Sequence, residues 1–388
     1  MNELALERLL REELRRIPVP PDATAPSIDL AVIVFPASSP PIAANVLLSR
    51  ELPEAHVARF EPGFGRVSNV RYVADIQDAT HDSIAWEDGA DWQALQFRPL
   101  AGTRGPRFVS PYPASLIKLM VAIGVGRLVD TGAASWNEPV THLGETRRVA
   151  EWADAMITVS SNAATEALVW LMHSRDLLSP RHNALNDLFD RLGLGTLRFD
   201  GTIASGGWRN ADGAGVGQLQ MTAWDTVRLL WSLRDDLGAP PWLSGDEPGP
   251  LSAESSRLLW HWLQDQALHE VLSTTLQADL PGVSSGIPAR LPARWLTADG
   301  RAAVGSLTTG MGIASMSARA DATFAHKTGT TDHYASDAGF VQGDDGRRYL
   351  IAVISTLGRR FAPHPRLATN SVLPKLGAAI DRWIKGQD

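Results

Sequence analysis

The chain has 388 residues, of which 44% are hydrophobic and 20% charged, and its formal net charge is −7 at pH 7. This composition is ordinary for a soluble globular protein with a large core, in one large or two smaller domains. The acidic balance argues against nucleic acid or an anionic membrane as the main partner, and the lack of cysteine excludes disulfides and thiolate metal sites.

The first 60 residues contain a predicted helix and strand but no pattern that assigns them a role. Residues 3–17 have the charged, amphipathic pattern of a helix, which the proline-rich run 18–21 ends. The run Asp29–Phe35 predicts a buried strand. The N-terminus lacks the apolar segment and cleavage site of a secretory signal, and no apolar run reaches the ~18 residues of a membrane span. We therefore expect a cytoplasmic protein without a membrane partner, in which residues 1–60 form an N-terminal extension of unclear role.

Two strands followed by a largely helical region are predicted for the middle of the chain. Alternating apolar positions favour strands over 67–75 and 92–99. An apolar helix follows from Pro113 to Asp130, and helical apolar spacing then recurs as far as residue 268. The predicted helices of this region are residues 150–155, 162–173, 182–192, 222–237 and 252–268.

The C-terminal part returns to a β pattern. Three strands are predicted at 322–328, 335–342 and 348–355, separated by turn residues. Residues 371–385 then form an amphipathic helix that we expect to pack on that sheet.

The start of the apolar helix carries a hydroxyl and an amine on one face. Pro113 suits a helix start, because its missing N–H costs nothing there. Ser115 and Lys118 stand three positions apart, so their side chains lie together on a helix. Burial lowers the pKa of an amine, and a neutral amine beside a serine can accept the hydroxyl proton. The pair therefore indicates an activated serine nucleophile, although this spacing alone is common.

Two further motifs make this interpretation more specific. Ser160-Ser161-Asn162 stands at the start of a predicted helix, and Lys327-Thr328-Gly329-Thr330 ends a predicted strand. Taken alone, the first would be a helix N-cap and the second a strand-end turn. In this order, the three motifs resemble the S-x-x-K, S-x-N and K-T-G signature of active-site-serine β-lactamases and penicillin-binding proteins.

The resemblance covers approximately residues 67–388. The fold that it implies is the α/β (α+β) fold of the class A β-lactamases, in which an antiparallel sheet is flanked by helices and joined by an all-helical subdomain. We expect a serine hydrolase domain of this kind at 61–388, with its helical subdomain at about 131–270. Two antiparallel strands precede the serine helix in this family, so 67–75 and 92–99 are the candidates for them.

The resemblance also implies a role for each motif residue. The catalytic candidates are Ser115, Lys118, Ser160 and Lys327, and the substrate-binding candidates are Asn162, Thr328, Gly329 and Thr330. In these roles Ser115 is the nucleophile, Lys118 its general base, and Ser160 a relay that passes a proton to the leaving group. Asn162 would hold the substrate's amide or acyl oxygen, while Lys327 and the two threonines would bind a substrate carboxylate. The backbone N–H groups of Ser115 and Thr330 would form the oxyanion hole.

The chain departs from class A β-lactamases at the loop that carries their deacylating glutamate. The equivalent residues 200–213 contain no glutamate. Glu166 falls on the helix directly after the second motif, and Asp212 stands in a glycine-rich stretch typical of a solvated loop. Ser161 replaces the family's usual aspartate, and residues 281–320 form a long insertion expected near the cleft mouth. Efficient class A hydrolysis of β-lactams is therefore not expected.

The leading hypothesis is a serine hydrolase that forms an acyl-enzyme on Ser115. Its substrate would be a small β-lactam, amide or ester that carries a carboxylate, with Arg359 and Arg360 as weaker candidates to meet that group. The alternatives are a penicillin-binding or sensing protein that is acylated without turnover, and a biosynthetic acyltransferase. No cofactor is expected, and no metal, because the ten histidines show no ligand spacing on one helix. His326 is expected to point to the opposite face of its strand from Lys327.

Overall fold

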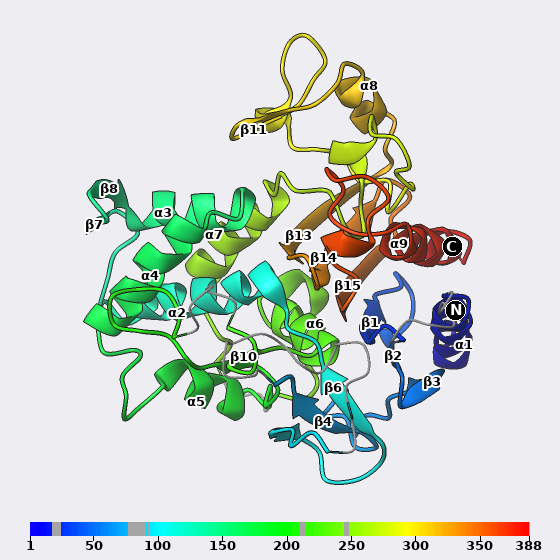
Figure 1. The fold of residues 1–388 in the computed structure, drawn as a ribbon, viewed down its shortest axis with the longest axis horizontal. Helices are drawn as coiled ribbons and strands as arrows, with labels where there is room; N and C mark the ends of the chain where they lie inside the picture. The colour runs from blue at the N-terminus through cyan, green and yellow to red at the C-terminus, as the bar shows by residue number, and fades with distance from the viewer. Residues whose placement is uncertain (18–24, 77–90, 92–93, 210–214, 244–247, 388) are drawn as a thin grey trace.

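A six-stranded antiparallel sheet forms the centre of the molecule, with strand order β13-β14-β15-β1-β2-β3 (Figure 1). The computed structural model describes residues 1–17, 25–76, 91, 94–209, 215–243 and 248–387. The sheet strands are β1 (Ile28–Val34), β2 (Ile42–Ser49), β3 (Leu52–Val57), β13 (Ala322–Thr330), β14 (Ala335–Gly343) and β15 (Arg348–Ser355). The strands β13, β14 and β15 confirm the β pattern predicted for the C-terminal part. Helix α9 (Val372–Lys385) confirms the helix predicted after it.

The central strand β1 explains why its sequence is apolar without alternation. Leu30 and Val32 point into the core on one face of the sheet, and Ala31 and Ile33 into the core on the other. A strand buried on both faces has no polar side, so the run from residue 29 to 35 is nearly continuous in hydrophobicity.

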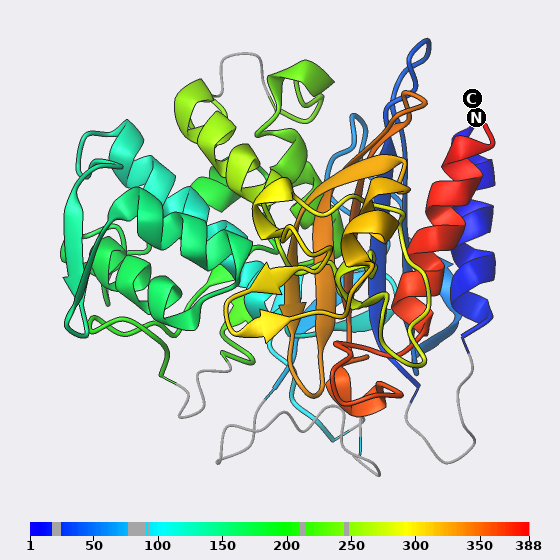
Figure 2. The same cartoon turned by 90° about the horizontal axis from the view of Figure 1, so that it is seen from above.

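Two helices from opposite ends of the chain cover one face of the sheet. Helix α1 (Glu3–Arg15) and helix α9 (Val372–Lys385) lie side by side there (Figure 2). Leu6, Leu10 and Leu14 recur every four residues and are fully buried, so they form the stripe with which α1 contacts β2 and β3.

Residues 1–60, expected to form an N-terminal extension of unclear role, are instead part of the main sheet. They supply three strands and a covering helix of the main sheet, because β1 pairs along its whole length with β15 and β2. The strand predicted at 67–75 exists as β4 (Arg71–Ala74), but it pairs with β5 (Pro99–Ala101) and β6 (Arg107–Ser110) in a separate small sheet. Residues 92–93 lie outside the described residues. The strands of the main sheet that precede the serine turn are therefore β1, β2 and β3, and alternation alone could not show which sheet a strand joins.

A helical half lies on the other face of the sheet and confirms the predicted helical region (Figure 1). Helix α6 contacts β1 and β15 directly, and Thr222 caps its N-terminus by accepting a hydrogen bond from the Asp225 N–H. No helix in the described ranges is long and apolar enough to cross a membrane. The helices of this half are α2 (Lys118–Asp130), α3 (Val149–Thr158), α4 (Asn162–Ser174), α5 (Ala184–Arg191), α6 (Ala223–Trp231) and α7 (Ala253–Gln264), with short strand pairs β7 (Pro139–His142) with β8 (Glu145–Arg148) and β9 (Arg198–Phe199) with β10 (Leu219–Gln220).

Residues 290–320 form a small lobe whose buried apolar side chains cluster with Ala267 and Leu276 of the preceding segment. It contains β11 (Ala303–Val304), β12 (Leu307–Thr308) and α8 (Ile313–Ala318), which project from the end of the molecule drawn at the top of Figure 1. Arg294 connects the lobe to the helical half, because its guanidinium contacts Asp154 of α3 at 3.0 Å and Asp265 at 2.8 Å.

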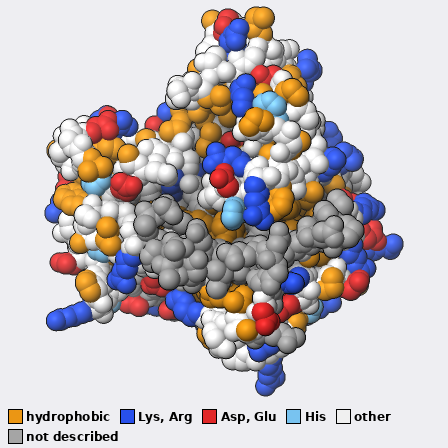
Figure 3. Space-filling model, in the orientation of Figure 1, with side chains coloured by type: hydrophobic (Ala, Val, Ile, Leu, Met, Phe, Trp, Pro, Cys, Tyr) orange, Lys and Arg blue, Asp and Glu red, His pale blue; other side chains and the backbone are white. Residues whose placement is uncertain are grey.

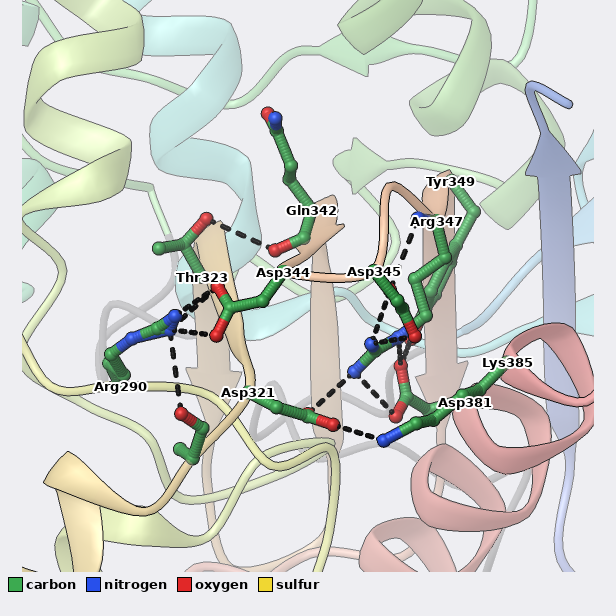
Figure 4. Close-up of polar contacts among 11 residues, drawn as sticks. Arg290, Asp321, Thr323, Gln342, Asp344, Asp345, Arg347, Tyr349, Asp381 and Lys385 are labelled. Atoms are coloured by element: carbon green, nitrogen blue, oxygen red, sulfur yellow. Dashed lines mark hydrogen bonds and ion pairs between the residues drawn. The ribbon is translucent and has the colours of Figure 1, made fainter. Parts of the chain in front are cut away.

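A buried arginine fastens α9 to the turn between β14 and β15 (Figure 4). The Arg347 side chain is fully buried and donates to Asp381 of α9 at 2.9 Å, to Asp345 at 2.7 Å and to Asp321 at 2.7 Å. The Tyr349 hydroxyl donates to the same Asp381 carboxylate at 2.8 Å. These contacts compensate the desolvation of the guanidinium with several charged partners.

Candidate active site

Ser115 stands on a tight turn between the small sheet and helix α2. The turn is a single 3-10 segment, η1 (Ala114–Ile117), and α2 begins at Lys118. Ala114 has a φ of 50°, which is an unfavourable backbone conformation for a residue with a Cβ. The strained turn leaves the Ser115 side chain half-buried, whereas Lys118 is only 2% exposed.

The Lys118 amine lies among four oxygen atoms of the first two motifs. Its Nζ is 3.0 Å from Ser115 Oγ, 3.1 Å from Ser160 Oγ, 2.6 Å from the Ser160 carbonyl oxygen and 2.7 Å from Asn162 Oδ1. The carbonyl and amide oxygens can only accept hydrogen bonds. They match the two N–H groups of a neutral amine, whose lone pair is then left for a hydroxyl proton.

Burial lowers the pKa of Lys118 well below its usual value, and the nearby charge of Lys327 lowers it further. The neutral amine is thereby favoured at a lower pH than in a solvated lysine. The hydrogen-bond geometry and the electrostatics thus agree on an amine that can accept a proton from Ser115.

Ser160 links the two lysines of the site. Its Oγ is 3.1 Å from Lys118 Nζ and 3.0 Å from Lys327 Nζ. Its φ of 58° is left-handed, which marks a second strained residue in the same site. The next residue, Ser161, has a structural contact, because its Oγ accepts a hydrogen bond from the Ala164 N–H and so caps α4.

Lys327 is fully buried on β13 and donates to Ser160 Oγ and, at 2.7 Å, to the Thr328 carbonyl oxygen. Burial lowers its pKa to about 7, while the carboxyl groups of Glu270 and Asp337 oppose that shift. Its charge therefore depends on pH near neutrality.

Gly329 lets β13 come close to the serine turn. A Cβ at this position would lie 2.4 Å from the Pro113 carbonyl oxygen and 2.7 Å from the Leu116 nitrogen, both of which belong to the backbone. From β14, Ser336 Oγ also donates to the Pro113 oxygen at 2.6 Å. Glycine is thus needed where the third motif meets the first.

The remaining substrate-binding candidates differ in how they meet solvent. Asn162 is exposed and Thr330 half-buried, but Thr328 is only 1% exposed.

The charged candidates of the sequence analysis have partners of their own. Arg359 lies 3.5 Å from Asp332, and the Arg360 guanidinium lies over the Phe361 ring at 4.6 Å. Glu166 lies 4.0 Å from His142. Asp212 lies outside the described residues.

Four acidic and histidine side chains beside the third motif had no role in the sequence analysis. His326 faces away from Lys327, and its Nδ1 is 2.7 Å from Asp337 Oδ1, with both side chains fully buried. The His269 ring meets the His326 ring edge-on at 4.6 Å between centroids. Burial raises the pKa of Glu270 to about 7, and the charges of Lys327 and Arg359 oppose that shift. Only the strand alternation of His326 was visible in the sequence, because the others are placed by long-range pairing.

The titratable side chains do not form a metal site in the part of the chain that the structure describes. No group of three or more His, Asp or Glu side chains there has the geometry to hold an ion.

The antiparallel sheet, the helical half and the serine turn between them define the class of serine β-lactamase-like and penicillin-binding proteins. The family model described as Beta-lactamase enzyme family matches residues 109–383, so the chain belongs to that family. A comparison with curated proteins finds no match. The family match and the shared architecture confirm the predicted family and fold class.

Solved structures with the same fold share little sequence with the chain. PBP-A has a TM-score of 0.53 at 14% identity, with 100% of this chain and 98% of that one covered. A PBP-A mutant, solved as an acyl-enzyme complex with penicillin G, has a TM-score of 0.52 at 15% identity, covering 100% and 99%. A mutant of the class A beta-lactamase of the last common ancestor of Gram-negative bacteria has a TM-score of 0.51 at 16% identity, with 99% of this chain and 100% of that one covered.

Proposed function

We propose that the protein is a serine hydrolase that forms an acyl-enzyme on Ser115 with a β-lactam, amide or ester substrate. The observation that carries this proposal is the 3.0 Å contact between Ser115 Oγ and a lysine amine whose N–H groups both meet obligatory acceptors. Membership of a family that uses serine acylation supports it.

In the first step, Ser115 Oγ attacks the substrate carbonyl carbon and gives its proton to Lys118 Nζ. The oxyanion of the tetrahedral intermediate accepts hydrogen bonds from the Ser115 and Thr330 backbone N–H groups. Ser160, which is within 3.1 Å of Lys118 and 3.0 Å of Lys327, passes a proton to the leaving nitrogen or oxygen. The bond to the leaving group breaks, and the acyl group stays on Ser115.

In the second step, water attacks the acyl carbonyl and releases the acid. Residues 200–213 carry no glutamate to activate that water. This absence favours one second candidate function, a penicillin-binding or sensing protein that is acylated with little turnover. Both functions share the acylation step and differ in the lifetime of the adduct.

Intact-mass spectra recorded over time with a penicillin, a cephalosporin and an activated ester test the proposal. We expect an adduct equal to the acyl group that disappears in Ser115→Ala, which removes only the nucleophile. A transient adduct with released product supports the hydrolase, and a persistent adduct supports the penicillin-binding alternative. Adduct formation that Ser115→Ala leaves unchanged would contradict both.

The substrate is proposed to be a small molecule that places its leaving group beside Lys327. A cation that contacts the proton-relaying Ser160 at 3.0 Å lies on the leaving-group side of the site. The expected substrate carboxylate would lie there too, between Lys327 and Thr330, and the charges around that position decide whether it is accepted.

A further inference from the structure

A buried pair of polar side chains lies on the reverse side of the strand that carries the third motif. His326 Nδ1 is 2.7 Å from Asp337 Oδ1, and neither side chain has any exposed surface. Successive side chains of a strand point to opposite faces, so His326 lies behind β13 while Lys327 faces the site. Charged side chains that meet solvent gather at the centre of the face drawn in Figure 3, below the lobe, but this buried pair is not among them.

The two faces of β13 belong to different parts of the core. On the side of His326, the Phe324 ring stacks on the imidazole at 4.1 Å between centroids and belongs to the apolar cluster that also contains the buried leucines of α1 and α9. On the side of Lys327, Ala325 belongs to the cluster of the helical half. The buried pair is therefore separated from the nucleophile by the thickness of the sheet, and it acts on the site through the strand.

Asp337 is itself held in place by neighbouring segments. Its Oδ2 accepts a hydrogen bond from the Leu272 N–H at 3.0 Å, which ties β14 to the segment after α7. The preceding residue of β14, Ser336, points to the other face and donates to the Pro113 carbonyl oxygen at 2.6 Å. Two successive residues of β14 thus hold the third motif from behind and the serine turn from the front.

The orientation of the His326 ring depends on one atom. Its Nε2 is buried and has no hydrogen-bond partner among the described residues. The His269 ring meets it edge-on at 4.6 Å between centroids, and Phe324 stacks on its face. Within the described part of the chain, the contact of Nδ1 with Asp337 is therefore the one hydrogen bond of this side chain.

The effect on the site passes through the next residue of the strand. The Lys327 amine is 3.0 Å from Ser160 Oγ, the proposed proton relay, and donates to the Thr328 carbonyl oxygen at 2.7 Å. The β13 backbone that His326 anchors from behind also sets the position of this amine. A misplacement of about 1 Å in such a contact can cost about 10²-fold in rate.

We propose that His326 is a positioning residue of the Ser115 site. Its hydrogen bond to Asp337 holds the β13 backbone, so that Lys327 keeps the relay hydroxyl in place to protonate the leaving group. This inference rests on the proposed acylation of Ser115 and adds a residue that does not touch the substrate. Its effect is confined to leaving groups that need a proton to depart.

The test uses two esters of one acyl group that differ in how the leaving group departs. The p-nitrophenyl ester releases a stable phenolate, whereas the trifluoroethyl ester releases an alkoxide that needs a proton from the relay. Intact-mass spectra give the rate constant for acylation of Ser115 by each ester. We expect His326→Gln to slow the trifluoroethyl ester by about ten-fold or more and the p-nitrophenyl ester by less than about two-fold.

The choice of variants separates positioning from a general loss of structure. His326→Asn places its amide as many bonds from the backbone as Nδ1, so we expect the ratio of the two rate constants to return to within about two-fold of the unaltered protein. His326→Gln places the same amide one bond further out, past the Asp337 carboxyl. Asp337→Ala removes the other partner, should shift the ratio in the same direction, and decides the question if His326→Gln does not fold.

His269→Gln is the matched control, because it alters a buried histidine of the same cluster that does not belong to β13. We expect the ratio of rate constants in this variant to equal that of the unaltered protein. Thermal unfolding of each variant shows whether it is folded.

Each outcome decides between the proposals. Equal slowing of both esters in His326→Gln, an unchanged ratio, an equal shift in His269→Gln, or a failure of His326→Asn to restore the ratio overturns the positioning role and leaves acylation of Ser115 intact. An unaltered protein that reacts with the p-nitrophenyl ester alone has no working relay, which also overturns the role of His326. Failure of both esters to acylate Ser115 in the unaltered protein overturns the proposed function, and the role of His326 falls with it.

Discussion

The hydroxyl of Ser160 is the one polar group that both lysines of the site contact among the described residues, at 3.1 and 3.0 Å. Its neighbour Ser161 has the same side chain but caps α4 instead. Of these two adjacent serines, one is placed for proton transfer and the other caps a helix. Each hydroxyl can therefore be removed by substitution without removing the contacts of the other.

Ser160→Ala should slow acylation of Ser115 by about 10²- to 10⁴-fold, the range for loss of a proton-transfer group. Ser161→Ala should leave that rate unchanged and instead cost about 1 kcal/mol of the free energy of unfolding, because a cap is lost. Stopped-flow acylation and urea unfolding of both variants measure the two quantities. Equal rates in the two variants would refute the assignment of Ser160 as proton relay.

At the level of elements, α9 depends on charged contacts as well as on its apolar stripe. Arg347 is enclosed by three carboxylates, and Asp381 is the only one of them that α9 supplies. The same carboxylate accepts the Tyr349 hydroxyl at 2.8 Å. Removing it leaves a buried guanidinium short of a partner.

Asp381→Asn should therefore lower the free energy of unfolding by about 3 kcal/mol, as expected when one partner of a buried ion pair is lost. Asp299→Asn is the matched control, because its pair with Arg301 is exposed and such pairs contribute about 0–1 kcal/mol. Urea unfolding of the two variants gives the comparison. A similar small loss in both would mean that the apolar contacts of α9 hold it without Arg347.

Across the whole molecule, local sequence patterns predicted individual helices and strands better than they predicted which segments pair with one another. The three motifs and the helices after Ser115 could be predicted, because each depends on residues close together in the sequence. The place of β1 in the sheet could not, since its partner β15 lies at the other end of the chain. The contact between the His269 and His326 rings was missed for the same reason, because the two residues meet only in the folded chain.

The N-terminal residues should be indispensable for folding. Deletion of residues 1–60 removes α1, β1, β2 and β3 and exposes the edge of β15 with the core beneath it. We expect residues 61–388 alone to be insoluble, and co-expression of residues 1–60 as a separate chain to recover soluble protein that Ser115-directed probes label. A soluble 61–388 fragment with cooperative unfolding would instead restore the boundary at residue 60.

The pairing of β1 with β15 also sets the order of events during synthesis. Ile28 lies opposite Ser355, so the first sheet strand to leave the ribosome must wait for the last before its open side is filled. Until then the nascent chain carries a long apolar strand with a free edge, which is prone to aggregate. Such long-range pairing makes folding slow, and the Ser115 turn that rests on this sheet can mature only after translation is nearly complete.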